Sequence, residues 1–174
     1  MHKRTFLFSL AALAMQPALA LYDPKPNGLL EVAIGAWKGT LTYRDYQNPN
    51  KMVVLPTRLV VSMTGPDELA LYYVFDDGPG KIVYSYERML FNVPKAELVW
   101  LSGSAKPTSN THRITAATTA DRTSKLSFEK TADLGVDRYT FEISPRAWAL
   151  SKAEVKSSGE ETLRSRYELT KSDA

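Results

Sequence analysis

The sequence contains 174 residues and no cysteine, which excludes disulfide bonds and a lipid anchor on an N-terminal cysteine. Its formal net charge is +3, but two of the 22 lysines and arginines, and none of the 19 acidic residues, lie within residues 1–20. The rest of the chain is therefore almost neutral, and because its basic residues are scattered among acidic ones, we expect no nucleic-acid partner.

The first twenty residues have the layout of a signal peptide. Two basic residues precede an apolar stretch over residues 6–15, and Ala18-Leu19-Ala20 supplies the small residues of a cleavage site. The apolar stretch is too short to span a membrane, because a spanning helix needs about 20 apolar residues. We expect cleavage after Ala20 and a mature protein, residues 21–174, that is periplasmic or secreted and has no membrane span.

The mature sequence is predicted to form a single all-β domain. Hydrophobic and polar residues alternate with a period of two along most of it, and turn residues such as Asp76-Asp77-Gly78-Pro79-Gly80 separate the alternating segments. A short helix is expected at residues 29–34. The expected strands cover residues 37–46, 52–63, 69–75, 81–91, 97–102, 113–118, 125–130, 138–143, 146–156 and 163–169. Segment 146–156 also has a helical interpretation, but a strand is preferred because Ser157-Ser158-Gly159 then closes a hairpin.

About ten short strands with regular turns are typical of an antiparallel barrel or a β-sandwich. Gly35-Ala36-Trp37, which opens the first expected strand, resembles the Gly-x-Trp signature of the calycins, the lipocalin-like barrels. The resemblance extends to secreted bacterial calycin-like proteins and to the nitrobindin-like branch. It implies one up-and-down barrel of about eight to ten strands. It also implies that Trp37 plugs the closed end beneath an arginine of the last strand, Arg164 or Arg166. A β-sandwich is the alternative fold.

The sequence carries no recognisable catalytic or metal-binding motif. The mature part contains a single histidine, His112, which lies in a polar stretch and is interpreted as a solvated loop residue. Gly78-Pro79-Gly80-Lys81 lacks the spacing of a phosphate-binding loop. We therefore predict no catalytic residue, no metal and no cofactor, and we favour a protein that is not an enzyme.

Four tyrosines lie on the apolar faces of their strands and form the predicted ligand-binding residues. They are Tyr43, Tyr73, Tyr139 and Tyr167. Ligand cavities are mostly apolar and contain a few placed polar groups, and inward tyrosines provide both. The alternative interpretation is that these tyrosines are ordinary core residues, since tyrosine favours strands in any case.

These observations lead to three hypotheses about function. The first is non-catalytic binding of a small, largely apolar ligand inside an exported calycin-like barrel. The second is a protein-interaction module of the envelope or the secreted fraction, an inhibitor or a complex subunit, with a packed barrel. The third is an enzyme that uses carboxylates or tyrosines within the barrel. A cavity of about 300 Å³ or more would favour the first hypothesis over the second.

Overall fold

The computed structural model of the protein describes residues 28–172. Within these residues it contains a short helix, α1 (Gly28–Glu31), a 3-10 turn, η1 (Val93–Lys95), and ten strands. The strands are β1 (Gly35–Arg44), β2 (Met52–Gly65), β3 (Glu68–Asp76), β4 (Ile82–Asn92), β5 (Glu97–Ser102), β6 (Thr108–Ala120), β7 (Thr123–Ala132), β8 (Gly135–Ile143), β9 (Ala147–Lys156) and β10 (Glu161–Lys171). The predicted signal peptide, residues 1–20, lies outside the described residues.

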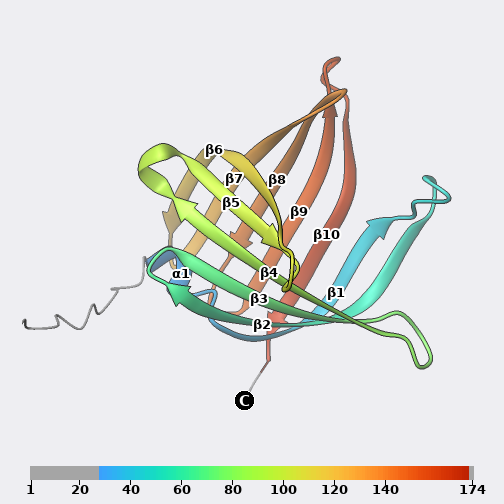
Figure 1. The fold of residues 1–174 in the computed structure, drawn as a ribbon, viewed down its shortest axis with the longest axis horizontal. Helices are drawn as coiled ribbons and strands as arrows, with labels where there is room; N and C mark the ends of the chain where they lie inside the picture. Colours follow the sequence, from blue (N-terminus) through green and yellow to red (C-terminus); the bar gives the residue numbers. More distant parts are fainter. Residues whose placement is uncertain (1–27, 173–174) are drawn as a thin grey trace, which may run out of the picture.

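The ten strands form a closed up-and-down barrel (Figure 1). Each strand pairs antiparallel with the next one in the chain, and β1 closes the barrel by pairing with β10, from Trp37 opposite Lys171 to Tyr43 opposite Ser165. Closure gives every strand a neighbour on both sides. The predicted all-β class and single antiparallel barrel are confirmed, and the β-sandwich alternative is wrong.

The positions of the strands follow the period-two alternation closely. The contested segment 146–156 is strand β9, and Pro56 lies in β2 just before Thr57, where the pairing of β2 with β3 begins. The main difference is β6, which begins at Thr108 instead of near Arg113. Its first residues pair with β5 although they are too polar to show an alternating pattern. The helix also differs, since α1 ends at Glu31 and not at residue 34.

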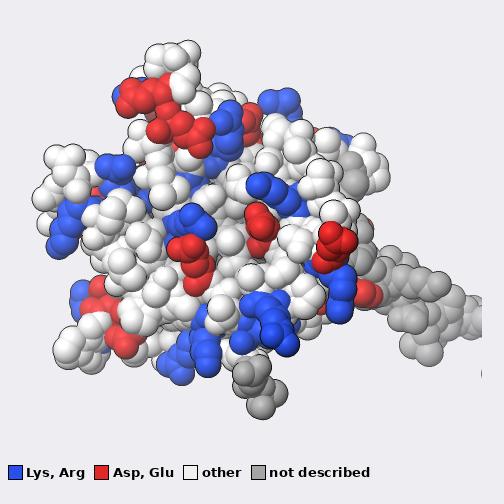
Figure 2. Space-filling model, turned by 180° about the vertical axis from the view of Figure 1, so that it is seen from behind, with Lys and Arg blue, Asp and Glu red and all other residues white. Residues whose placement is uncertain are grey.

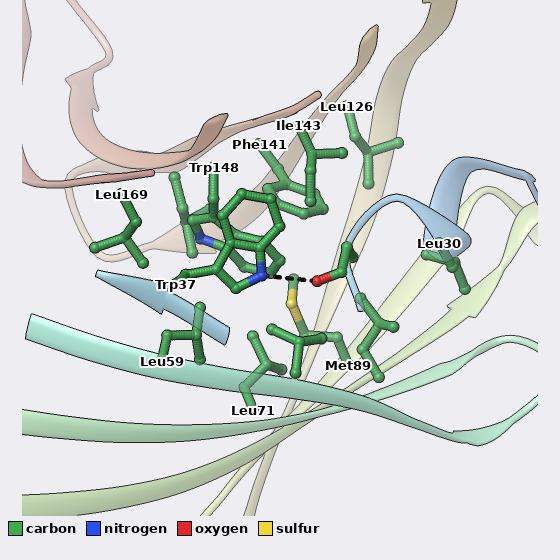
Figure 3. Close-up of a cluster of buried hydrophobic side chains, with 14 of the residues drawn as sticks. Leu30, Trp37, Leu59, Leu71, Met89, Leu126, Phe141, Ile143, Trp148 and Leu169 are labelled. Carbon is green, nitrogen blue, oxygen red and sulfur yellow. Dashed lines mark hydrogen bonds between the residues drawn. The ribbon is translucent and has the colours of Figure 1, made fainter. Parts of the chain in front are cut away.

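Apolar side chains fill the end of the barrel that α1 covers (Figure 3). Trp37 is only 1% exposed, and its Nε1 donates a hydrogen bond to the Ala33 carbonyl oxygen at 2.9 Å. Its ring centroid lies 6.0 Å from that of Trp148. Around these two rings pack inward side chains from several strands and from α1. They include Leu30, Leu59, Leu71, Met89, Phe141 and Leu169. This end of the barrel is therefore a packed core.

The cation that packs on Trp37 is a lysine, Lys171, and not an arginine. Its Nζ lies 4.3 Å from the centroid of the Trp37 ring. The prediction that Arg164 or Arg166 takes this position is wrong: Arg164 lies 4.6 Å from the ring centroid of Tyr46, and Arg166 is exposed. The antiparallel pairing of β1 with β10 explains the difference, because it places the start of β1 against the end of β10.

Acidic and basic side chains are interspersed over most of the face seen in Figure 2. Ion pairs also link neighbouring strands, as between Arg138 of β8 and Glu129 of β7, 2.9 Å apart. Among residues 28–172, no helix is long and apolar enough to cross a membrane.

Candidate functional site

A pocket of about 510 Å³ opens at the mouth of the barrel, at the end away from α1. We call it the mouth pocket. Its walls come from β1, β2, β3, β4 and β10 and from the turns after β1 and β3. The lining residues are Leu41, Tyr43, Tyr46, Leu55, Phe75, Asp77, Val83, Ser165 and Tyr167. Apolar and aromatic side chains dominate, and phenols, a hydroxyl and a carboxylate supply polar groups.

Two stacked aromatic residues extend the wall of the mouth pocket into the barrel. Tyr73 stacks on Phe75, with centroids 5.6 Å apart and planes 9° apart, and lies 5.2 Å from Tyr167. Tyr73 is fully buried, and its hydroxyl has no hydrogen-bond partner within residues 28–172. Burial is the main cause that raises the pKa of Tyr73 and of Tyr167, and the nearby Glu87 carboxylate is the second cause. Both side chains are therefore neutral phenols at physiological pH.

Glu87 of β4 places a carboxylate inside the barrel. Trp100 donates its Nε1 hydrogen to Glu87 Oε2 at 2.9 Å, and the Ser85 hydroxyl donates to Oε1 at 3.4 Å. Burial raises the pKa of Glu87, and the two hydrogen bonds act in the opposite direction. Within the described part of the chain this carboxylate forms no ion pair, whereas Asp137 pairs with Lys152 at 2.7 Å.

A second aromatic cluster lies beside Trp100 on the β5 to β8 side of the barrel. The Phe128 and Tyr139 rings are stacked, with centroids 5.0 Å apart, and Tyr139 lies 5.6 Å from Trp100. His112 packs edge-on against both Phe128 and Tyr139. At 3% exposure His112 is a buried residue of β6, so its interpretation as a solvated loop residue is wrong. Burial lowers the pKa of His112, which favours the neutral imidazole.

Two lysine side chains that point into the barrel near its open end already have polar partners. Lys152 pairs with Asp137, and Lys130 Nζ donates to Asn110 Oδ1 at 2.6 Å. A second pocket, of about 350 Å³, adjoins Asp137 and Lys152 between β8 and β9 and includes Leu134. Its lining is more strongly charged than that of the mouth pocket, which makes it the poorer candidate for an apolar ligand.

The structure divides the four predicted ligand-binding tyrosines between two places. Tyr43 and Tyr167 line the mouth pocket, and Tyr73 lies directly behind Tyr167. Tyr139 belongs to the second cluster with His112 and Trp100. The four tyrosines therefore all lie on the inner side of the barrel, but they do not surround one shared cavity.

Sequence reasoning missed Glu87 and the exposed Tyr46. Alternate residues of a strand face the same side, and Glu87 shares its side of β4 with Val83, which lines the mouth pocket, and with the buried Met89. Had the inward face of this strand been assigned from the sequence, Glu87 would have been found. Tyr46 follows the end of β1, where strand parity no longer predicts the direction of a side chain.

Residues 28–172 contain no group of three or more His, Cys, Asp or Glu side chains arranged to hold a metal ion. Glu87 and His112 both contact Trp100, but His112 is neutral and enclosed by aromatic rings. The arrangement is suited to binding through apolar contact and hydrogen bonds.

The comparisons with known proteins find similarity in structure and not in sequence. No known family profile matches the chain, and no curated protein matches it at a significant level. Among solved structures, Rv2717c from M. tuberculosis superposes with a TM-score of 0.60 at 10% identity, covering 84% of this chain and 98% of its own. The S-type phycobiliprotein lyase CPES from Guillardia theta superposes with a TM-score of 0.54 at 8% identity, covering 83% of this chain and 90% of its own.

At such low identity these similarities establish the fold alone. They extend over most of each chain, so the whole barrel is shared and not only a few hairpins. Together with the closed ten-strand antiparallel topology, they show that the protein shares a barrel fold with these two structures, which fits the expected calycin-like fold.

Proposed function

We propose that this protein is an exported calycin-like binding protein that holds a small, largely apolar ligand in the mouth pocket without covalent chemistry. The observation that carries the proposal is the volume of the pocket, about 510 Å³. Ligand sites typically have about 300–1,000 Å³ and a mostly apolar lining. Export rests on the signal-peptide pattern of residues 1–20 and is part of the proposal.

The lining of the mouth pocket defines the class of ligand. Leu41, Leu55 and Val83 offer aliphatic contact, and Phe75 and Tyr167 offer aromatic rings whose centroids lie 6.4 Å apart. Flat, apolar molecules pack well against such surfaces. One protein of the same fold is a phycobiliprotein lyase, but at 8% identity it does not specify the ligand of this chain.

A neutral fluorescent probe, N-phenylnaphthylamine, tests the proposal. We expect saturable binding with increased fluorescence, and we expect Ser165→Trp to abolish it, because Ser165 lines the mouth pocket and a tryptophan fills the space. Ser109→Trp is the matched control, since Ser109 is exposed on β6. Absence of saturable binding to the folded protein, or equal binding by both variants, would contradict the proposal.

A second candidate function, a protein-interaction module, is favoured by an apolar patch on the outer face of β2, β3 and β4. Val60 is 52% exposed and Tyr84 76% exposed, and the Tyr72 ring packs against that of Tyr86 with centroids 4.8 Å apart. Exposed apolar patches often mark docking surfaces. A photoreactive residue in place of Tyr84 would then capture a defined partner in the native envelope, whereas one in place of Ser109 would not.

A further inference from the structure

The interior of the barrel contains a carboxylate that the binding of a purely apolar ligand does not use. Glu87 accepts hydrogen bonds from Trp100 and Ser85 but has no cationic partner within residues 28–172. A buried charge without a counter-ion destabilises a protein, so most buried carboxylates are paired. The Glu87 side chain is only half-buried, so it is not completely enclosed by the protein.

One aromatic ring contacts the Glu87 carboxylate, and others lie near it. The Trp100 indole donates to it, and Tyr139 lies 5.6 Å from Trp100. The carboxylate also contributes to the raised pKa of Tyr73 and of Tyr167. The faces of such rings attract organic cations, and the attraction adds to that of a carboxylate.

An unpartnered polar atom lies in the same place. The Tyr73 hydroxyl is buried and has no hydrogen-bond partner within the described chain. Tyr73 pairs across the sheet with Ser85, which donates to Glu87. A phenol oxygen can accept a hydrogen bond from an N–H group, so a ligand nitrogen there would satisfy both Tyr73 and Glu87.

This site adjoins the mouth pocket through the ring of Tyr167. Tyr167 lines the pocket on one side and contacts Tyr73, 5.2 Å away, on the other. To reach Glu87, a molecule in the mouth pocket would have to pass the Tyr167 ring. The interior cations Lys152 and Lys130 do not compete for this place, because Asp137 and Asn110 hold them near the rim.

We propose that Glu87 is the polar anchor of the site and that the ligand is a hydrophobic amine, protonated at neutral pH, whose nitrogen binds between Glu87 and Tyr73. This inference rests on the proposed function, since the apolar part of the amine occupies the mouth pocket. It predicts that the protein discriminates between ligands of the same shape by charge: it favours a cation, accepts a neutral molecule and disfavours an anion.

Three naphthalene probes test the inference by equilibrium dialysis with naphthalene fluorescence as the readout: naphthylethylamine, ethylnaphthalene and naphthylacetate. We expect the unmodified protein to bind the amine about tenfold or more tightly than the acetate, the size expected for a charge-assisted hydrogen bond. Glu87→Gln should remove most of this preference and leave the affinity for ethylnaphthalene unchanged. Glu168→Gln, which removes an exposed carboxylate of β10, is the matched control and should keep the preference.

The outcomes separate the inference from the proposed function. If ethylnaphthalene binds but the amine has no advantage, or keeps it in Glu87→Gln, the mouth pocket stands and the anchor is wrong. If none of the three probes binds saturably, the proposed function fails and the anchor with it. The comparison of the three probes on the unmodified protein needs no variant, so a missing advantage of the amine overturns the anchor even if Glu87→Gln does not fold.

Discussion

At the scale of single residues, the alternation of side chains along a strand predicts whether a residue faces into or out of the barrel. It does not predict how far along the barrel axis the residue lies. The signature Gly35-Ala36-Trp37 correctly places Trp37 in the core. The partner of Trp37 was predicted wrongly because Arg164 and Arg166 lie in the first half and at the middle of β10, whereas the register puts Trp37 opposite Lys171, at its end. Register depends on how the barrel closes, which no local pattern contains.

Trp37→Ala should lower the free energy of unfolding by about 3–5 kcal/mol, the range for truncation of a buried tryptophan. The residue is 1% exposed, donates to Ala33 and contacts Trp148. Lys171→Met is the control: it keeps the aliphatic cover over the ring and removes only an ammonium, so its effect should be about 1 kcal/mol or less. Urea denaturation followed by circular dichroism measures both. Similar, small losses in the two variants would show that Trp37 is not a core residue.

Glu87 should destabilise the folded protein at neutral pH. Because burial raises its pKa in the folded state, the folded protein holds this proton more tightly than the unfolded chain does. Stability therefore falls as pH rises from the unfolded pKa, about 4.3, through the raised folded pKa. Glu87→Gln cannot ionise, so its stability relative to the unmodified protein should increase between about pH 4 and about pH 8. Urea titrations at both pH values measure the difference in the free energy of unfolding between the two proteins. A difference that stays constant or shrinks over this interval would show that the pKa of Glu87 is not raised in the folded state.

At the scale of elements, the sequence predicted most strands because one face of each packs inside the barrel. The start of β6 was missed because Ser109, Asn110 and Thr111 are polar on both faces there. Such residues pair in the sheet without an apolar signal, and His112 was misread for the same reason. The closure of β1 on β10 was implied by the resemblance to calycins and not by any pattern within the two strands.

The seam between β1 and β10 depends on close backbone approach at Gly39. A Cβ atom at this position would lie 2.1 Å from the Glu168 carbonyl oxygen, which is far inside contact distance. Gly39→Ala should therefore force the two strands apart and destabilise the barrel by more than about 2 kcal/mol. Thr40→Ala, next to it in the same strand, is the control and should have a smaller effect. Thermal unfolding of the two variants tests the prediction, and equal melting temperatures would rule it out.

At the scale of the whole molecule, the barrel has a packed end and an open end. Trp37, Trp148 and Leu30 fill the first, and the mouth pocket occupies the second. The sequence predicted tyrosines on the inner face, but it could not show whether their rings fill the interior or border a space. That depends on how ten strands curve and how far each hairpin extends, which period-two alternation does not encode.

Methyl NMR during titration with ethylnaphthalene tests most directly whether the mouth pocket binds ligand. The account predicts saturable shifts at Leu41, Leu55 and Val83, which line the pocket. Methyl groups of Leu98 in the packed core and of Val60 on the outer face should remain unchanged. Saturable shifts at Val60 with none at the pocket methyls would contradict the account and favour the outer face as the functional surface.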